Sequence, residues 1–189
     1  MGIFKQLFKK KISLSFIAKH FASIAADTND IMQMVSKADI SKSTIDKIKI
    51  DLVFLQIFII DYIISVKFNQ YEQKIIKDEF YPTMISCFEN IEYSSEIQVQ
   101  GGIQNFIIEG IMTTLDKYYM AVHICNDFEE LSENIGNVFA ILAGLKSDTK
   151  VQSAGSAFFR VKVHILNNFI DSHDIEKVTE IAPNVRLRL

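Results

Sequence analysis

Fifteen residues from Leu52 to Val66, LVFLQIFIIDYIISV, are apolar on almost every side of a helix and are interrupted only by Gln56, Asp61 and Ser65. A helix of that length extends about 22 Å, whereas the hydrocarbon core of a bilayer is about 30 Å thick. The segment therefore predicts a buried central helix rather than a membrane span. Because such a helix must be covered by other helices, we expect an all-α, single-domain bundle of five to seven helices around a central helix at about residues 42–68.

The polar residues of this central helix fall on two different sides. Lys47, Asp51, Asp61 and Ser65 share a narrow polar stripe, whereas Gln56 lies opposite and should be buried. A buried amide needs hydrogen-bond partners. Gln56 is therefore either a structural link to a neighbouring helix, which we favour, or the polar handle of a pocket.

Length and composition indicate one domain. The chain of 189 residues is large enough to fold without disulfides or a structural metal, and it has two prolines, seven glycines and no linker-like tract. We expect a basic amphipathic segment at residues 1–12 and a helical bundle domain at residues 13–189. Thirty isoleucines against three arginines are typical of an AT-rich bacterial genome.

Charge is distributed unevenly along the chain. Residues 1–20 contain five lysines and no acidic residue, whereas the rest has 15 basic and 23 acidic side chains. The acidic body repels phosphates, which disfavours nucleic acid as a partner. Cys87 and Cys125 show no CxxC or Cys/His spacing, so we expect free thiols in a reducing, cytoplasmic compartment, with a disulfide between them as the alternative.

The N-terminal segment has two interpretations. Its apolar and basic residues alternate at helical spacing and comprise Ile3, Phe4, Leu7 and Phe8 with Lys9, Lys10 and Lys11. They predict either a helix that lies on an anionic membrane surface at the inner face of the membrane, or a segment packed on the bundle with its lysines in water. We favour packing on the bundle over membrane contact.

A heptad pattern follows this segment. Its seam positions recur at alternating steps of three and four residues and are apolar except for Thr28, namely Leu14, Ile17, Phe21, Ile24, Thr28, Ile31, Val35 and Ala38. The pattern predicts one continuous helix from about Ser13 to Ala38, with the polar residues 27–30 on its outer side. We expect it to pair antiparallel with the central helix, and pairing with another copy of the chain is the alternative.

Further helices are expected along the rest of the chain. They cover residues 70–93, with a kink or break at Pro82, then 103–124, 127–145, a helix continuing to about Asp171, and a short helix between Ser172 and Pro183. On the 103–124 helix the expected core face is Ile108, Met112, Leu115, Tyr119 and Val122. Gly136, Ala140 and Gly144 stand four residues apart and predict a helix-packing groove for the small residues 153–157, with a symmetric dimer contact as the alternative.

Signatures of catalysis are absent from the sequence. It contains no P-loop, GxGxxG, GxSxG or HExxH pattern, no histidine follows a carboxylate at the spacing of a di-iron site, and we expect neither cofactor nor metal. The candidate acid/base residues are Asp61, Glu109, Asp116 and His123. The last three lie seven residues apart on one helical face, which we interpret first as an ordinary solvated face.

The function expected from these features is non-catalytic. A helical bundle without a reactive motif and with a long apolar seam is typical of a protein that binds a protein partner or itself, including as a homodimer. The alternatives are a peripheral membrane or lipid-binding or small-molecule-binding bundle, and an enzyme with a dispersed acid/base site.

Overall fold

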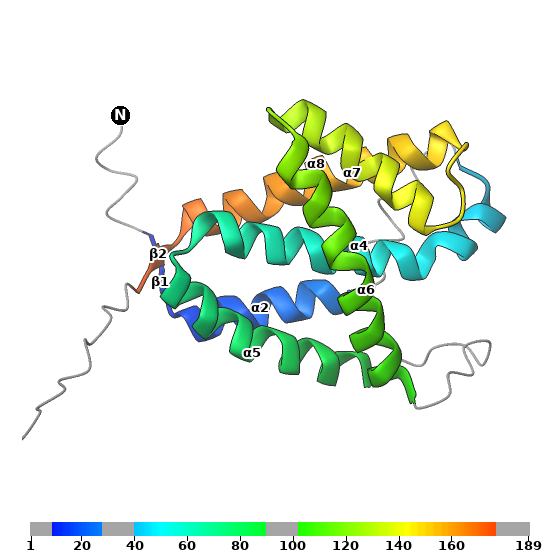
Figure 1. Cartoon of the computed structure of the whole chain (residues 1–189). Coiled ribbons are helices and arrows are strands. Elements are labelled where there is room, and N and C mark those ends of the chain that lie inside the picture. Colours follow the sequence, from blue (N-terminus) through cyan, green and yellow to red (C-terminus); the bar gives the residue numbers. More distant parts are fainter. Residues whose placement is uncertain (1–8, 28–39, 90–101, 177–189) are drawn as a thin grey trace, which may run out of the picture.

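The computed structural model describes residues 9–27, 40–89 and 102–176. Within these ranges the chain forms α2 (Leu14–Ala26), α4 (Lys42–Lys67), α5 (Gln70–Glu89), α6 (Gly102–Ile124), α7 (Phe128–Leu142) and α8 (Thr149–Ser172), with β1 (Lys11–Ile12) parallel to β2 (Asp174–Ile175). The helices pack together around α4 (Figure 1). The expected all-α bundle is therefore confirmed.

Helix α4 is the buried centre of the molecule. All ten residues from Leu52 to Asp61 are buried, and each of the five other described helices contacts α4. Its first turn is capped by Ser41, whose hydroxyl accepts the N–H of Thr44 at 3.2 Å. Within the described part of the chain, no helix combines the length and apolarity needed to cross a membrane.

Helix α2 is shorter than the heptad pattern predicts. It ends at Ala26, and Asp27 is its C-cap in a non-helical conformation. The expectation of one continuous helix over residues 13–38 is therefore wrong. Short polar side chains such as those at 27–30 compete with helical hydrogen bonds, and this local preference outweighs the heptad spacing. The later positions of the pattern, residues 28–38, lie outside the described residues.

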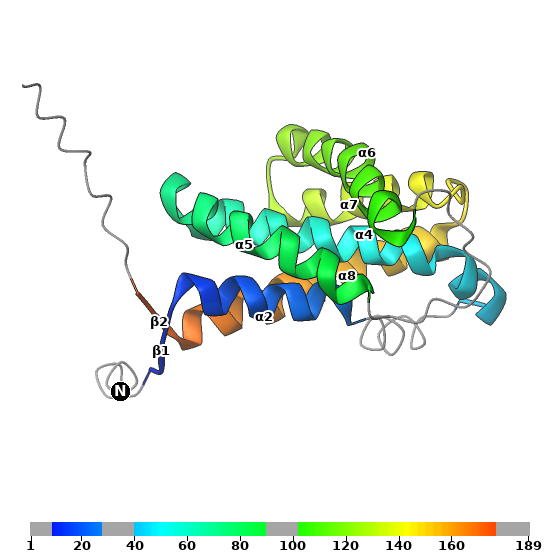
Figure 2. The same ribbon diagram turned by 90° about the horizontal axis from the view of Figure 1, so that it is seen from below.

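The main neighbour of α2 is α5 rather than α4. Ser15 donates a hydrogen bond to Glu79 (2.9 Å), and the Lys19 ammonium lies 3.2 Å from the same carboxylate. Figure 1 and Figure 2 both show α2 and α5 side by side. The expected pairing of the first helix with the central helix is thus wrong, because α4 divides its surface among five neighbours.

Gln56 connects α4 to the end of α2. Its amide nitrogen lies 2.6 Å from the carbonyl oxygen of Ile24 and 3.3 Å from that of Ala25. Both carbonyls belong to the last turn of α2, where intrahelical donors run out. The Ile24 carbonyl also accepts the backbone N–H of Asp27 at 3.1 Å. The interpretation of Gln56 as a structural link is confirmed.

Helix α5 passes through Pro82 without a break. Proline removes one helical hydrogen bond and crowds the preceding turn, which is why a kink or division is expected there. Phe80 and Met84 are fully buried on either side of Pro82. We infer that the packing of these two side chains against the core keeps the helix continuous through Pro82.

The two ends of the described chain meet in the β1–β2 sheet. Asp174 donates its N–H to the carbonyl of Lys10 (3.1 Å), and Glu176 donates to that of Ile12 (3.0 Å). The prediction of a short helix after Ser172 is therefore wrong for Asp174 and Ile175, which form a strand. This pairing joins segments too far apart in sequence for local pattern to indicate it.

Helices α7 and α8 approach closely at two glycines. A Cβ at Gly136 would lie 2.3 Å from the carbonyl oxygen of Gln152, and one at Gly155 would lie 2.6 Å from the Phe139 ring. Ala140 is buried in the same contact. Gly144, in contrast, lies beyond the end of α7 with a φ of +69° and no atom near its Cβ position, so its assignment to the packing groove is wrong.

The close approach at Gly136 generates a stability prediction. Gly136→Ala would gain helix propensity of about 1 kcal/mol but must displace the Gln152 backbone. We expect a net loss of about 1–3 kcal/mol in the free energy of unfolding, measured by urea denaturation. Asn137→Ala, at the next and exposed position, is the control and should change stability by less than about 0.5 kcal/mol. A Gly136→Ala protein as stable as wild type would contradict the close contact.

Candidate functional site

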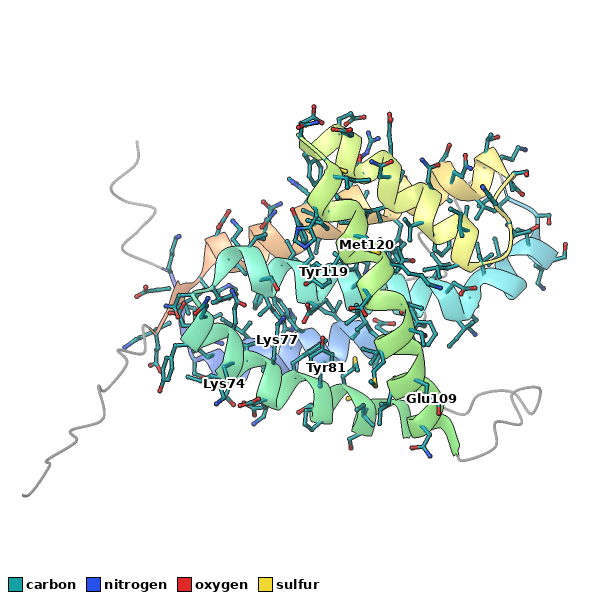
Figure 3. All side chains as sticks on the ribbon, in the orientation of Figure 1. Lys74, Lys77, Tyr81, Glu109, Tyr119 and Met120 are labelled. Carbon is teal, nitrogen blue, oxygen red and sulfur yellow. The ribbon has the colours of Figure 1, made fainter. Side chains whose placement is uncertain are left out.

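A cluster of polar side chains surrounds Asp61 in the middle of the bundle. Asp61 lies on α4 and is 3% exposed. Its Oδ1 atom is 2.8 Å from the Lys77 ammonium and accepts the Tyr81 hydroxyl at 2.7 Å, while its Oδ2 atom accepts the Tyr119 hydroxyl. Figure 3 labels Lys77 and Tyr81 on α5 and Tyr119 on α6. The carboxylate thus joins three helices.

Ser65 completes this cluster one turn after Asp61. Its hydroxyl donates to the Asp61 backbone carbonyl (2.9 Å), lies 3.2 Å from the Tyr119 hydroxyl and accepts from the Lys77 ammonium at 3.3 Å. We refer to Asp61, Ser65, Lys77, Tyr81 and Tyr119 as the polar cluster. Four of its side chains contact at least two others, and Tyr81 contacts Asp61 alone.

The electrostatics of the polar cluster favour a fixed arrangement. Burial, followed by the negative charge of Asp61, raises the pKa of both Tyr81 and Tyr119 above the usual value, so both phenols stay protonated as donors. The Lys77 ammonium compensates the buried negative charge. Both carboxylate oxygens are engaged, and a substrate would have to displace one of these donors. The arrangement is better explained as a link between helices than as an acid/base site.

Sequence reasoning selected Asp61 but none of its side-chain partners. The available signal was Lys77 and Tyr81, which stand four residues apart and therefore share one face of α5. A carboxylate within an apolar helix requires a cation and donors, and this spacing offers both from one neighbouring helix.

A half-buried carboxylate, Asp51, lies nearer the start of α4. Burial raises the pKa of Asp51 to about 6. Burial and the charge of Asp51 together raise the pKa of Tyr118, whose hydroxyl is buried without a hydrogen-bond partner among the described residues. The charged form of Asp51 is therefore unfavourable in the folded protein.

The apolar residues of α6 face two directions. Ile107 and Tyr118 are fully buried, and the Phe54 ring of α4 packs against Gly110. Ile108 and Met112, which the sequence places on the core face, are 39% and 71% exposed. Their assignment to the core is therefore wrong. Apolar side chains occur nearly all round α6, so periodicity alone does not distinguish its inner face from its outer one.

The outward side of α6 combines apolar and charged side chains. Glu109, Asp116 and His123 are all exposed, as their interpretation as a solvated face requires. Between and beside them lie Met120 (69% exposed) and Ile124 (70% exposed). We define the α6 outer face as Ile108, Glu109, Met112, Asp116, Met120, His123 and Ile124. The structure does not bring Asp61 together with the other three acid/base candidates.

The side chains of two of the three described lysines before α2 contact residues near the end of the described chain. Lys9 donates to the backbone carbonyl of Asp171, Lys10 lies 5.8 Å from the centre of the Phe16 ring, and Lys11 lies 3.4 Å from the Glu176 carboxylate. The apolar membrane-contact candidates Ile3, Phe4, Leu7 and Phe8 lie outside the described residues.

The arginine in a groove between α7 and α8 is already engaged by other side chains. A groove of about 450 Å³ lies between α7 and α8, and its lining includes Arg160. The Arg160 guanidinium pairs with Glu129 (2.8 Å) and donates to Ser132 (2.8 Å) and Ser156 (3.3 Å). Across residues 9–27, 40–89 and 102–176, no three His, Cys, Asp or Glu side chains gather to hold a metal, and both cysteines are free.

The polar cluster generates a stability prediction. Tyr119→Phe removes only the hydroxyl that donates to Asp61, and we expect the free energy of unfolding to fall by about 1–3 kcal/mol in urea denaturation. Tyr71→Phe, on an exposed tyrosine of α5, is the matched control and should cost less than about 0.5 kcal/mol. Equally small losses in the two variants would show that the cluster does not stabilise the fold.

The raised pKa of Asp51 generates a pH-dependent prediction. A carboxyl group with a higher pKa in the folded than in the unfolded state stabilises the fold when protonated, and that contribution is lost as pH rises through about 6. Asp51→Asn stays neutral, so it should raise Tm by a few degrees at pH 7.5 and leave it nearly unchanged at pH 4. Asp116→Asn, at an exposed position, is the control. An equal change at both pH values for Asp51→Asn would refute the assignment.

Comparisons of the chain with protein-family models, with curated proteins and with solved structures found no match. Function is therefore inferred from the polar cluster and the α6 outer face alone.

Proposed function

We propose that this chain is a non-catalytic binding module that docks a protein partner, or a second copy of itself, through the α6 outer face. The observation that carries this proposal is the exposure of Met112, Met120 and Ile124, each about 70% accessible on one helix. Isolated exposed apolar residues are common, but several along one helix face are typical of an interaction surface.

The side chains on this face suit protein binding. Methionine is flexible and polarisable, so it adapts to the shape of an apolar partner. Glu109, Asp116 and His123 lie among the apolar residues and provide a polar rim that selects orientation. In Figure 1 α6 lies across the front of the bundle, with no other described element covering it.

The alternative functions have less support. An enzymatic role for the polar cluster would require a substrate to compete with the donors that already occupy Asp61. Membrane contact through the α6 outer face would bring Glu109 and Asp116 toward anionic headgroups, which repel them. The free thiols Cys87 and Cys125 are compatible with a reducing compartment, and we propose a cytoplasmic location on that basis.

Site-specific photocrosslinking in the cells that naturally produce the protein tests the docking surface. A photoreactive benzoylphenylalanine replaces Met120 in one variant and the exposed Lys49 of α4 in the control. We expect a defined covalent adduct from position 120, mapped to one partner peptide, and none from position 49. The adduct should be lost when Met112→Glu is added. Equal labelling from both positions, or no adduct from either, would overturn the proposal.

A further inference from the structure

The α6 outer face is symmetric about Asp116. Isoleucines stand eight residues before and after it, at Ile108 and Ile124, and methionines stand four residues before and after it, at Met112 and Met120. Seven residues away are Glu109 on one side and, on the other, His123, whose ring N–H can donate a hydrogen bond to a carboxylate. When the order of the face is reversed, Ile108 therefore takes the place of Ile124, and Met112 takes the place of Met120.

We propose that the occupant of the α6 outer face is the same face of a second copy, packed antiparallel about a two-fold axis at Asp116. This inference rests on the proposed function and names its partner. A two-fold interface is self-complementary, because a residue i of one copy meets j of the other and j meets i. The α6 outer face meets that requirement at all three spacings.

The geometry of an antiparallel helix pair brings matching residues to the same height. At 1.5 Å per residue, Met112 and Met120 lie about 6 Å on opposite sides of Asp116 along the axis, and Glu109 and His123 lie about 10 Å on opposite sides. Reversal of the second copy therefore places its Met120 beside Met112 of the first. The four methionines then form two pairs across the seam, one on each side of Asp116.

Charge selects the antiparallel orientation over the parallel one. In the antiparallel pair, Glu109 of each copy faces His123 of the other, which gives two favourable contacts at opposite ends. In a parallel pair, Glu109 would face Glu109, and that contact is repulsive. The two Asp116 side chains approach each other at the axis, and the exposed Lys117 of each copy lies next to them in sequence and offsets their repulsion.

The contact is small, which sets the expected affinity. One helix from each copy buries less surface than the roughly 1,200 Å² of a standard stable interface. We therefore expect a dimer with a Kd of about 1–100 µM rather than an obligate assembly.

Reciprocal charge reversal tests this dimer by sedimentation velocity at pH 7 over about 5–500 µM protein, a range that brackets the expected Kd. The wild-type chain, 21.6 kDa as a monomer, should approach twice that mass at the highest concentration. His123→Glu alone opposes two carboxylates at each end and should raise Kd about fivefold or more. Met112→Glu should also weaken the dimer, whereas the exposed control Lys49→Glu on α4 should leave it unchanged.

The decisive variant combines Glu109→Lys with His123→Glu. Positions 109 and 123 lie about 21 Å apart along one helix, so they do not interact within one copy. The double variant should return Kd to within about twofold of wild type, because each end has a Lys–Glu pair in place of the Glu–His pair. Circular dichroism confirms that each variant keeps its helical content.

The outcomes separate the two proposals. A wild-type chain that stays monomeric at 500 µM, or a double variant that is not rescued, overturns the antiparallel dimer. If position 120 then still crosslinks to a different protein, the docking function stands and its partner is not a second copy. If position 120 gives no adduct and the chain is monomeric, both proposals fail.

Discussion

The structure depends on a central helix that exposes almost no surface to solvent along its middle. Helix α4 buries ten consecutive residues, so its stability comes from the five helices around it rather than from its own surface. Two of its buried polar residues then fix where three of those helices sit. Gln56 holds the end of α2, and Asp61 holds α5 and α6 through hydrogen-bonded side chains. Apolar contact supplies the driving force, while these buried polar groups select one arrangement among many apolar ones.

The same organisation connects the interior to the proposed docking surface. Tyr119 and Met120 are neighbours on α6, yet Tyr119 points inward to Asp61 and Met120 is exposed. A helix that is held by its inner face presents its outer face in one conformation. Such a surface loses little conformational freedom on binding, which favours affinity even where the contact area is small. The polar cluster therefore positions α6 for the docking that we propose, without itself lining the α6 outer face.

Sequence reasoning predicted the features with a strong local cause. The bounds of α4 follow from its apolarity and its serine cap, and the role of Gln56 follows from the requirement to satisfy a buried amide. Three features were missed for identifiable reasons. Helix α2 ends at its C-cap Asp27, within an apparently regular heptad pattern. On α6, apolar residues on both faces leave the direction of burial to tertiary packing. The partners of Asp61 come from helices whose relative position no local pattern specifies.

The β1–β2 pairing has a mechanical consequence. The strands run parallel, β1 near one end of the chain and β2 near the other. Tension applied to the two ends therefore pulls the strands past each other along their length. The interstrand hydrogen bonds, among them those from Asp174 to Lys10 and from Glu176 to Ile12, are loaded together in shear rather than opened one after the other. The smallest element of the fold is thus the first to bear load when the molecule is stretched, and it shields the helices until it yields.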